Sequence, residues 1–117
     1  MQRYNMFYQD SPRLYHYTDI EGAAGIKREG YIRPVPPHGE FEAGIYLNDL
    51  DPYLHNRTEI LLNNYGPQHM YEMDEGRADF VVVIPSNQIV ADFLRTYRYT
   101  NRKLFCYTGH IYVGKNQ

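Results

Sequence analysis

Few residues of this chain have the types and spacing needed for metal or nucleophilic chemistry. Cys106 and His110 lie four residues apart in a segment predicted to be extended, which separates them by about 13 Å at strand rise. The thiol therefore meets that base only if the chain folds back at Thr108–Gly109. No two histidines, and no histidine with the single cysteine, have zinc-ligand spacing, and no GxGxxG, Walker, HExxH or CxxC pattern occurs. We therefore expect neither a metal site nor a cysteine nucleophile. The five histidines are His16, His38, His55, His69 and His110.

Two short blocks in the first half combine a histidine with tyrosines and acidic residues. One reads LYHYTDIEGAAGIKREGYIRP (14–34), and the other, after a proline-rich loop, reads GIYLNDLDP (44–52). The first block places His16 between two tyrosines on an alternating stretch that predicts a strand. Each residue alone has a structural interpretation: His16 as a core histidine bonded to a carbonyl, Tyr46 as a core tyrosine, and Asp49 as a turn residue. Their combination and order are harder to explain by packing.

Together the two blocks resemble ADP-ribosyltransferases. More narrowly, they are similar to the branch with an H-Y-D signature, in the lineage of diphtheria toxin and the poly(ADP-ribose) polymerases. The first block matches the pattern LYHYT…GI…G.I.P and the second matches G.Y..D, in the same order and with a loop between them. The rest of the chain agrees with the family only in outline.

The resemblance implies an ADP-ribosyltransferase-like fold, with two small packed sheets and an NAD cleft between them. In the family, the first-strand histidine binds the adenosine-side ribose, and the next residue binds the nicotinamide amide through its backbone; here these are His16 and Tyr17, with Thr18 beside the amide. The tyrosine that stacks on the nicotinamide ring corresponds to Tyr46, and Asp49 matches the acidic residue shortly after it. The resemblance therefore implies His16, Tyr46 and Asp49 as catalytic residues, and His16, Tyr17, Thr18 and Tyr46 as NAD-binding residues.

Elementary chemistry is consistent with such a site. Nicotinamide in NAD is a flat cation, which the face of an aromatic ring attracts. A histidine can donate to a ribose hydroxyl without carrying a full charge. Cleavage of the glycosidic bond produces an oxocarbenium-like centre and a neutral leaving group, so the site needs negative charge near the ribose and control of water.

The chain departs from the family near its end. Many transferases of this lineage carry a glutamate on a late strand, but KLFCYTGHIYV (103–113) has no acidic residue. Thr108, Gly109 and His110 stand near the expected place, and Asp79 is a carboxylate on a different predicted strand. We therefore do not expect polymer formation. Transfer of one ADP-ribose, hydrolysis of NAD, and binding of NAD without turnover all stay open.

The leading interpretation is a mono-ADP-ribosyltransferase that uses NAD as substrate and acts on a protein or nucleic-acid acceptor. The alternatives are a catalytically weak NAD- or ADP-ribose-binding module, an NAD-glycohydrolase toxin, and a tyrosine-rich interaction domain without an NAD site. A basic cluster with interleaved tyrosines suits either a nucleic-acid strand or a solvated turn. The cluster is Arg95, Tyr97, Arg98, Tyr99, Arg102 and Lys103.

The pattern of elements predicts an α+β fold, because strands outnumber helices and the helices fall mostly in the first half. Thr18 and Glu21 have capping-box spacing for the first helix, which Gly30 would end. After the first helix we expect a short strand at 31–33, a loop at 34–44 and a strand within 44–52. A helix over 52–65 would begin at Asp51–Pro52 and end at Gly66, and an exposed loop would follow at 67–78. The rest of the chain predicts a strand at 79–85 buried on both faces, an ambiguous stretch at 86–103 with a short helix or 3₁₀ segment and a turn, and one or two strands at 104–114 broken at Gly109.

Size and charge set the class of protein. The 117 residues suit one domain spanning 1–117, long enough to form a core without metal or disulfide. The net charge of −2 does not demand nucleic acid or an anionic membrane. No long apolar run or signal peptide is present, and a single cysteine suits a reducing compartment. We expect a cytoplasmic protein, or one delivered into a host cell, without membrane contact.

Overall fold

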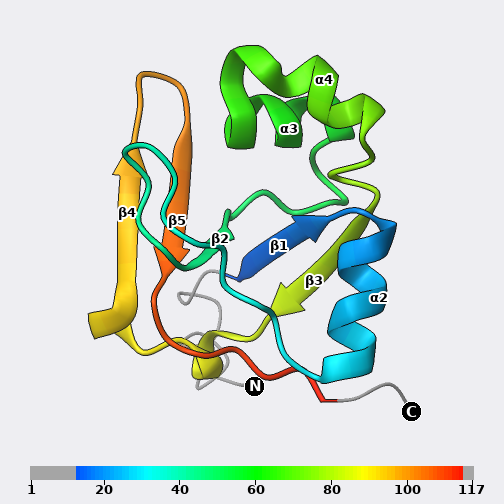
Figure 1. The fold of residues 1–117 in the computed structure, drawn as a ribbon. Coiled ribbons are helices and arrows are strands. Elements are labelled where there is room, and N and C mark those ends of the chain that lie inside the picture. The colour runs from blue at the N-terminus through cyan, green and yellow to red at the C-terminus, as the bar shows by residue number, and fades with distance from the viewer. Residues whose placement is uncertain (1–12, 115–117) are drawn as a thin grey trace, which may run out of the picture.

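The structure, a computed structural model, describes residues 13–114 (Figure 1). Within that range, five short strands form two small antiparallel sheets, one of β1 and β3 and one in the order β2–β5–β4. The predicted α+β class is confirmed at this level. The strands are β1 (Leu14–Thr18), β2 (Ile45–Leu47), β3 (Phe80–Ile84), β4 (Leu94–Arg98) and β5 (Lys103–Tyr107). The helices are α2 (Ile20–Glu29), α3 (Arg57–Tyr65) and α4 (His69–Asp74), with 3₁₀ turns at Gly66–Gln68, Ser86–Gln88 and Ala91–Phe93.

The two sheets meet where β1 passes the end of β2. Tyr15 N donates to Asn48 O at 2.8 Å, and Asn48 N donates to Tyr15 O at 3.0 Å. From this junction β3 lies on the far side of β1, while β5 and then β4 extend from the other edge of β2 (Figure 1). The sheets therefore diverge from a junction that contains parts of both sequence blocks.

The main hydrophobic core lies between the two sheets. Strand alternation directs Ile45 and Leu47 into it and turns Tyr46 to the opposite face. A smaller cluster of Ile60, Leu61 and Ala78 packs under α3. The main core consists of Leu14, Ile26, Ile32, Ile45, Leu47, Ile84, Tyr107 and Ile111.

Helix α2 begins one residue later than the capping-box spacing predicts. The N-cap is Asp19, whose Oδ1 accepts from Gly22 N at 2.8 Å, so the prediction of Thr18 as the cap is wrong. The hydroxyl of Thr18 instead lies against Gly22, where an added Cβ would come within 2.0 Å of Thr18 Oγ1. Gly30 ends the helix with φ 81°, as predicted.

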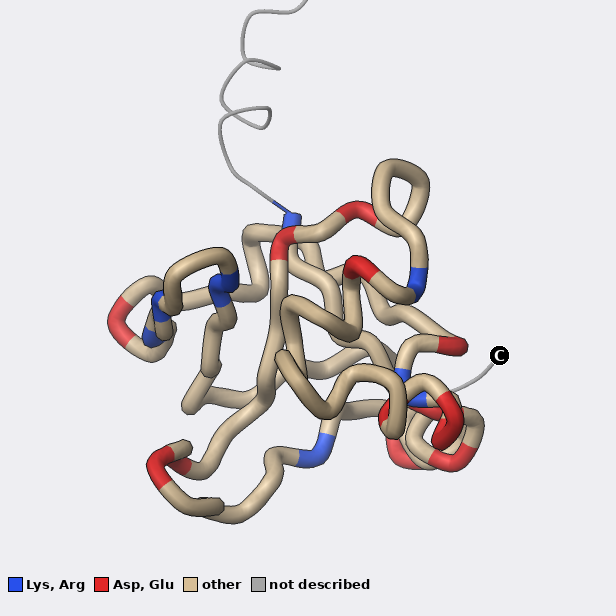
Figure 2. Tube along the Cα trace, turned by 90° about the horizontal axis from the view of Figure 1, so that it is seen from above, with Lys and Arg blue, Asp and Glu red and all other residues tan. Residues whose placement is uncertain are grey.

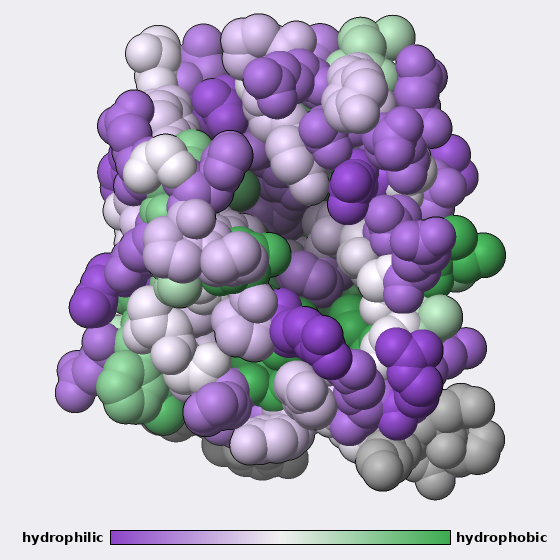
Figure 3. All heavy atoms as spheres, in the orientation of Figure 1, coloured by the Kyte–Doolittle hydropathy of each residue, from purple (hydrophilic) through white to green (hydrophobic). Residues whose placement is uncertain are grey.

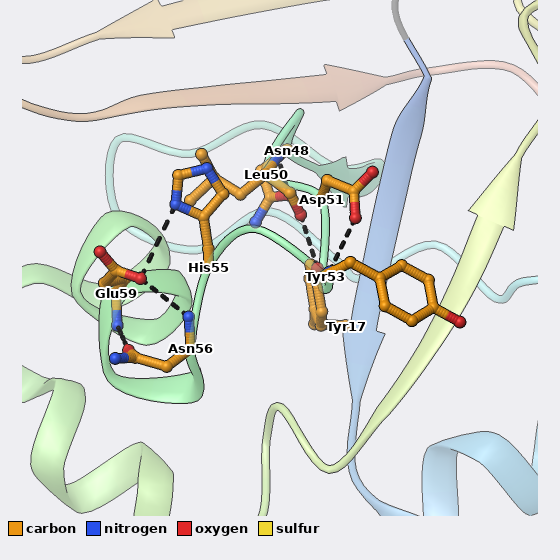
Figure 4. Close-up of polar contacts among 8 residues, drawn as sticks. All are labelled: Tyr17, Asn48, Leu50, Asp51, Tyr53, His55, Asn56 and Glu59. Carbon is orange, nitrogen blue, oxygen red and sulfur yellow. Dashed lines mark hydrogen bonds and ion pairs between the residues drawn. The ribbon is translucent and has the colours of Figure 1, made fainter.

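The second helix is shorter than the predicted span 52–65. Asp51 does not cap it; its Oδ1 accepts from Tyr53 N at 2.7 Å and forms a turn (Figure 4). The helix starts at Arg57, after a capping box in which the side chains of Asn56 and Glu59 each accept from the other's backbone N–H at 2.8 Å. Gly66 ends α3, as predicted.

Two expectations for the middle of the chain were wrong. The stretch 67–78 is not a plain loop, because it includes α4. Strand β3 is not buried on both faces: Phe80, Val81 and Val83 are 42%, 36% and 45% exposed. The β-branched run therefore marked a strand correctly but not its burial, because β3 belongs to a sheet of only two strands within the described range.

The stretch 86–103, whose structure was ambiguous from the sequence, is described in full. It contains two 3₁₀ turns and then β4, which forms a hairpin with β5. After β5 the chain leaves the sheet, and Tyr112 makes an isolated bridge with Tyr31. The short strand predicted at 31–33 is therefore only this bridge, together with a bond from Ile32 N to Ile111 O at 3.0 Å.

Candidate functional site

One side-chain contact links the two sequence blocks. Nδ1 of His16, on β1, lies 3.0 Å from the backbone oxygen of Tyr46, on β2, thirty residues away in the sequence. Because a carbonyl oxygen can only accept, Nδ1 carries the proton of this hydrogen bond. The fold thus brings His16 to the backbone of Tyr46, at the junction where the sheets diverge.

Burial determines the charge of this imidazole. Removal from water lowers the pKa of His16 below its ordinary value of 6.5, and this effect outweighs the opposing hydrogen bond to Tyr46. The ring is therefore neutral at pH 7, and with Nδ1 protonated its Nε2 carries a lone pair. In this tautomer Nε2 can only accept a hydrogen bond, which is the reverse of the donor role considered from the sequence.

The ring of Tyr46 points away from the core side of its sheet. It packs edge-on to Phe41, with 6.0 Å between ring centroids, and lies 6.3 Å from the ring of Tyr97. Its hydroxyl donates to Glu42 O at 2.6 Å, and burial raises its pKa. The register pairs Tyr46 with Cys106, so both side chains lie on one face. His16 thus contacts the backbone of Tyr46, while the ring forms an aromatic cluster on the outer face.

Tyr17 and Thr18 complete β1 beyond His16. The hydroxyl of Tyr17 donates to Leu50 O at 2.6 Å and ties the strand to the segment after β2 (Figure 4). Burial raises the pKa of this phenol, which therefore stays protonated. Tyr17 also lines a cavity of about 270 Å³ together with Arg57 and Asp79. Thr18 closes the strand against the start of α2.

Asp49 is held by a cation from the second sheet. Its Oδ2 lies 3.0 Å from Nζ of Lys103, and the same ammonium lies 5.4 Å from the centroid of the Phe105 ring. The side chain of Asn63, on α3, fixes the backbone of Lys103: Asn63 Oδ1 accepts from Lys103 N, and Asn63 Nδ2 donates to Lys103 O, both at 2.9 Å. Asp49 is thus a positioned carboxylate with a neutralising partner.

The residues near the position expected for the late-strand glutamate make packing contacts and hydrogen bonds within the chain. Thr108 Oγ1 donates to Phe93 O at 3.1 Å, and the ring of His110 stacks on Tyr112 with 6.1 Å between centroids. Gly109 lies against Tyr107, whose ring would come within 2.9 Å of an added Cβ. Asp79 precedes β3 and pairs with Arg57 at 3.3 Å, beside Tyr17.

Cys106 is buried on the same sheet face as Tyr46. It is fully buried, its Sγ lies 3.8 Å from Ala43 O, and burial raises the pKa of the thiol. His110 is exposed and stacks on Tyr112. Burial and a raised pKa keep this thiol protonated, whereas a cysteine nucleophile reacts as the thiolate.

Three members of the basic cluster predicted from the sequence make polar contacts within the chain. Arg95 lies 3.7 Å from the Glu42 carboxylate, Arg102 Nε donates to Asn63 O at 2.9 Å, and Lys103 pairs with Asp49. In Figure 2 several basic positions gather at the left edge, with an acidic position beside them, and the remaining charged positions are spread around the described chain. The contacts of Arg95, Arg102 and Lys103 with other residues of the chain favour the solvated-turn interpretation over a nucleic-acid surface.

Sequence reasoning missed the residues that hold this arrangement together. Asn48 is buried, donates to Asn64 Oδ1 at 2.9 Å and accepts from Leu50 N at 3.0 Å. Asn63 and Lys103 are forty residues apart, so no local pattern could pair them. The local signal was composition, namely two asparagines on α3, Asn48 before it, and a lysine at the start of a strand.

Within residues 13–114, no group of three or more His, Cys, Asp or Glu side chains gathers as a metal site, and no helix there is long and apolar enough to span a membrane. Comparison with protein-family models, with curated proteins and with solved structures gave no significant match.

Proposed function

We propose that this chain is a mono-ADP-ribosyltransferase, with an NAD cleft at the junction of its two sheets. The observation that carries the proposal is the 3.0 Å contact between His16 Nδ1 and Tyr46 O. The resemblance rests on two blocks that are separate in the sequence, and this contact puts one residue of each block together. Packing between any two strands does not require a histidine at that point.

The proposed reaction breaks the bond between C1′ of the ribose and the nicotinamide nitrogen. The bonding electrons leave with nicotinamide, which becomes neutral, and C1′ becomes oxocarbenium-like. A hydroxyl or amine of the acceptor, or water, then bonds to C1′ and loses a proton to solvent. In this proposal the neutral His16 accepts a hydrogen bond from a ribose hydroxyl, and the carboxylate of Asp49 provides negative charge near the substrate.

A binding module without turnover is the second candidate. It is favoured by the state of Asp49, whose charge is offset by Lys103 at 3.0 Å. It is also favoured by the late segment, where Thr108 and His110 are used in packing. Such a domain would bind NAD or ADP-ribose and release no nicotinamide.

The test is incubation of the pure protein with NAD and measurement of released nicotinamide, with and without a cell lysate. Release that depends on lysate supports transfer to an acceptor. Release without lysate indicates hydrolysis or automodification, and an intact-mass spectrum separates these two. No release, but a rise in melting temperature with NAD, supports the binding module. No release and no thermal shift contradict the proposal.

A further inference from the structure

Strand β3 has a partner strand along one side only within the described residues. It pairs with β1 in a two-stranded sheet, and in Figure 1 no other strand lies along its second side. Helix α2 is also on this side in Figure 1, but it buries Ile26 in the main core and makes no hydrogen bond to β3. Val81 and Val83 are 36% and 45% exposed, and Figure 3 shows hydrophobic surface where β3 lies, near the middle of this face. Solvent therefore reaches both the edge of β3 and one face of its side chains.

The hydrogen-bond pattern identifies the backbone groups at this edge. The N–H and C=O of Tyr15 both bond to Asn48, on the side of β1 opposite to β3. Because these groups alternate sides along a strand, Tyr15 and its partner Val83 form a non-hydrogen-bonded pair. The same holds for Val81 opposite Tyr17, so the N–H and C=O groups of both valines point outward from the sheet. No backbone group within residues 13–114 bonds to these outward groups.

The outer edge of the other sheet has a different composition. In the described part of the chain that edge is β4, which carries Arg95 and Arg98. Charged side chains on an edge strand oppose pairing with another chain. Strand β3 reads FVVVI, with no charged residue, glycine or proline. One edge is therefore protected against a further strand, and the other has the composition of a strand that pairs on both sides.

A second copy of β3 fits this edge in an antiparallel register with a two-fold axis at Val82. In that register Val81 of each copy lies opposite Val83 of the other, and Phe80 lies opposite Ile84. The two valine pairs are then hydrogen-bonded pairs, in which every outward N–H and C=O of one copy meets a partner on the other. Their side chains also share one face, so the exposed valines of the two copies lie side by side.

Neighbouring registers satisfy fewer of these groups. A shift by one residue places each outward group opposite an inward one. A shift by two brings in Pro85, which has no N–H, or Asp79, whose N–H already donates to Gly76 O at 3.1 Å. In the register centred on Val82, Asp79 lies opposite Pro85 of the second copy and keeps Arg57 as its ion-pair partner at 3.3 Å. Pairing of two copies therefore brings no like charges together along the strand.

We propose that two copies of this chain pair through β3 and form one antiparallel sheet in the order β1–β3–β3–β1. The contact is isologous, so it closes at two copies and leaves no further β3 edge for a third. A two-stranded sheet is only marginally stable alone, and pairing doubles its strand number. This inference goes beyond the proposed function and does not depend on it.

The experiment is sedimentation of the wild type over a series of concentrations, compared with Val83→Pro and Val83→Thr. The wild type is expected to form a dimer. Proline removes an outward N–H and its ring obstructs a second strand, so the dimer is expected to dissociate at least tenfold more readily. Threonine is the matched control, because it keeps the N–H and the β-branch, and it is expected to dimerise like the wild type. Val83→Lys adds a cation at the same exposed position and decides the question if the proline variant does not fold.

Amide hydrogen exchange tests the same edge residue by residue. The amides of Val81 and Val83 are expected to gain protection as the protein concentration rises, whereas the amide of Val82, which faces β1, is protected throughout. A wild type that stays monomeric at millimolar concentration overturns the proposal. A dimer that survives both Val83→Pro and Val83→Lys lies elsewhere on the molecule and also overturns it. A monomer with protected Val81 and Val83 amides shows that another part of the same chain covers the edge, which contradicts pairing with a second copy.

Discussion

His16 is the residue on which the functional argument depends most. Its Nδ1 is committed to the backbone oxygen of Tyr46, so the other ring nitrogen is the one suited to meet a ligand. Burial keeps the ring neutral, and a neutral Nε2 accepts from a hydroxyl. A structural and a ligand-binding role are therefore compatible in one imidazole.

Replacement of this side chain separates the two roles. His16→Ala removes Nε2, the nitrogen proposed to meet the ligand, and is expected to abolish NAD-dependent nicotinamide release, or NAD binding if there is no turnover. It also removes one buried hydrogen bond, at a cost of about 1 kcal/mol in the free energy of unfolding. The matched control is His38→Ala, because His38 is exposed in the loop before β2. Full activity in folded His16→Ala would show that the assignment is wrong.

Acidification should weaken the fold through the same histidine. The lowered pKa means that between the folded value and the ordinary value of 6.5 the unfolded state binds a proton that the folded state does not. The stability contributed by neutral His16 is therefore present above pH 6.5 and declines as the pH falls below it. Urea unfolding at pH 7.5 and pH 5.5 should show a larger loss of stability for the wild type than for His16→Ala. Equal losses in the two proteins would contradict this account.

At the scale of elements, local signals in the sequence predicted the presence of helices and strands better than the residues at which they begin. Gly30 and Gly66 were correctly predicted as helix ends, because a glycine there is a local requirement of the backbone. The starts of α2 and α3 were misplaced, because several capping residues compete over a few positions and tertiary contacts choose among them. Asp51 is occupied by a turn and by the hydroxyl of Tyr15, which donates to it at 3.2 Å.

Two glycines inside α2 should respond in opposite ways to the same substitution. An added Cβ at Gly22 comes within 2.0 Å of Thr18 Oγ1, whereas at Gly25 the nearest atom is Arg28 Nη2 at 3.5 Å. Gly25→Ala should stabilise the fold by up to about 1 kcal/mol through helix propensity. Gly22→Ala should destabilise it by about 1–3 kcal/mol, since the start of the helix must shift from β1. Chemical denaturation measures both, and stabilisation by Gly22→Ala would mean that α2 is not packed on the end of β1 as described.

At the scale of the whole molecule, the class of fold was predictable and the arrangement of its parts was not. Strand number and spacing indicated α+β, but the contacts that assemble the candidate site join residues far apart in the sequence, such as His16 with Tyr46 and Lys103 with Asn63. The exposure of β3 could not be predicted from the sequence either, because a run of β-branched residues occurs both in a partly exposed two-stranded sheet and in a sheet buried on both faces. The resemblance implied that His16 and Tyr46 line one cleft; the structure brings His16 to the backbone oxygen of Tyr46 and packs the Tyr46 ring against Phe41 and Tyr97.

Cys106 gives a probe of how the three-stranded sheet opens. It is the only cysteine, it is fully buried, and its raised pKa keeps the thiol protonated. A thiol reagent should therefore modify the native protein at least a hundredfold more slowly than the unfolded chain, with a rate set by opening of the structure. Modification of the native protein at the rate of the unfolded chain would contradict the burial of Cys106 on β5, the central strand of this sheet.

The most direct test of the central claim is the nitrogen NMR signals of the His16 side chain during titration with NAD. The account predicts one signal typical of a protonated nitrogen, assigned to Nδ1 and little changed by NAD, and one typical of a lone-pair nitrogen, assigned to Nε2, which shifts in a saturable way as NAD binds. Signals of His16 that stay constant up to millimolar NAD, while the protein remains folded, would contradict an NAD site at the junction of the two sheets.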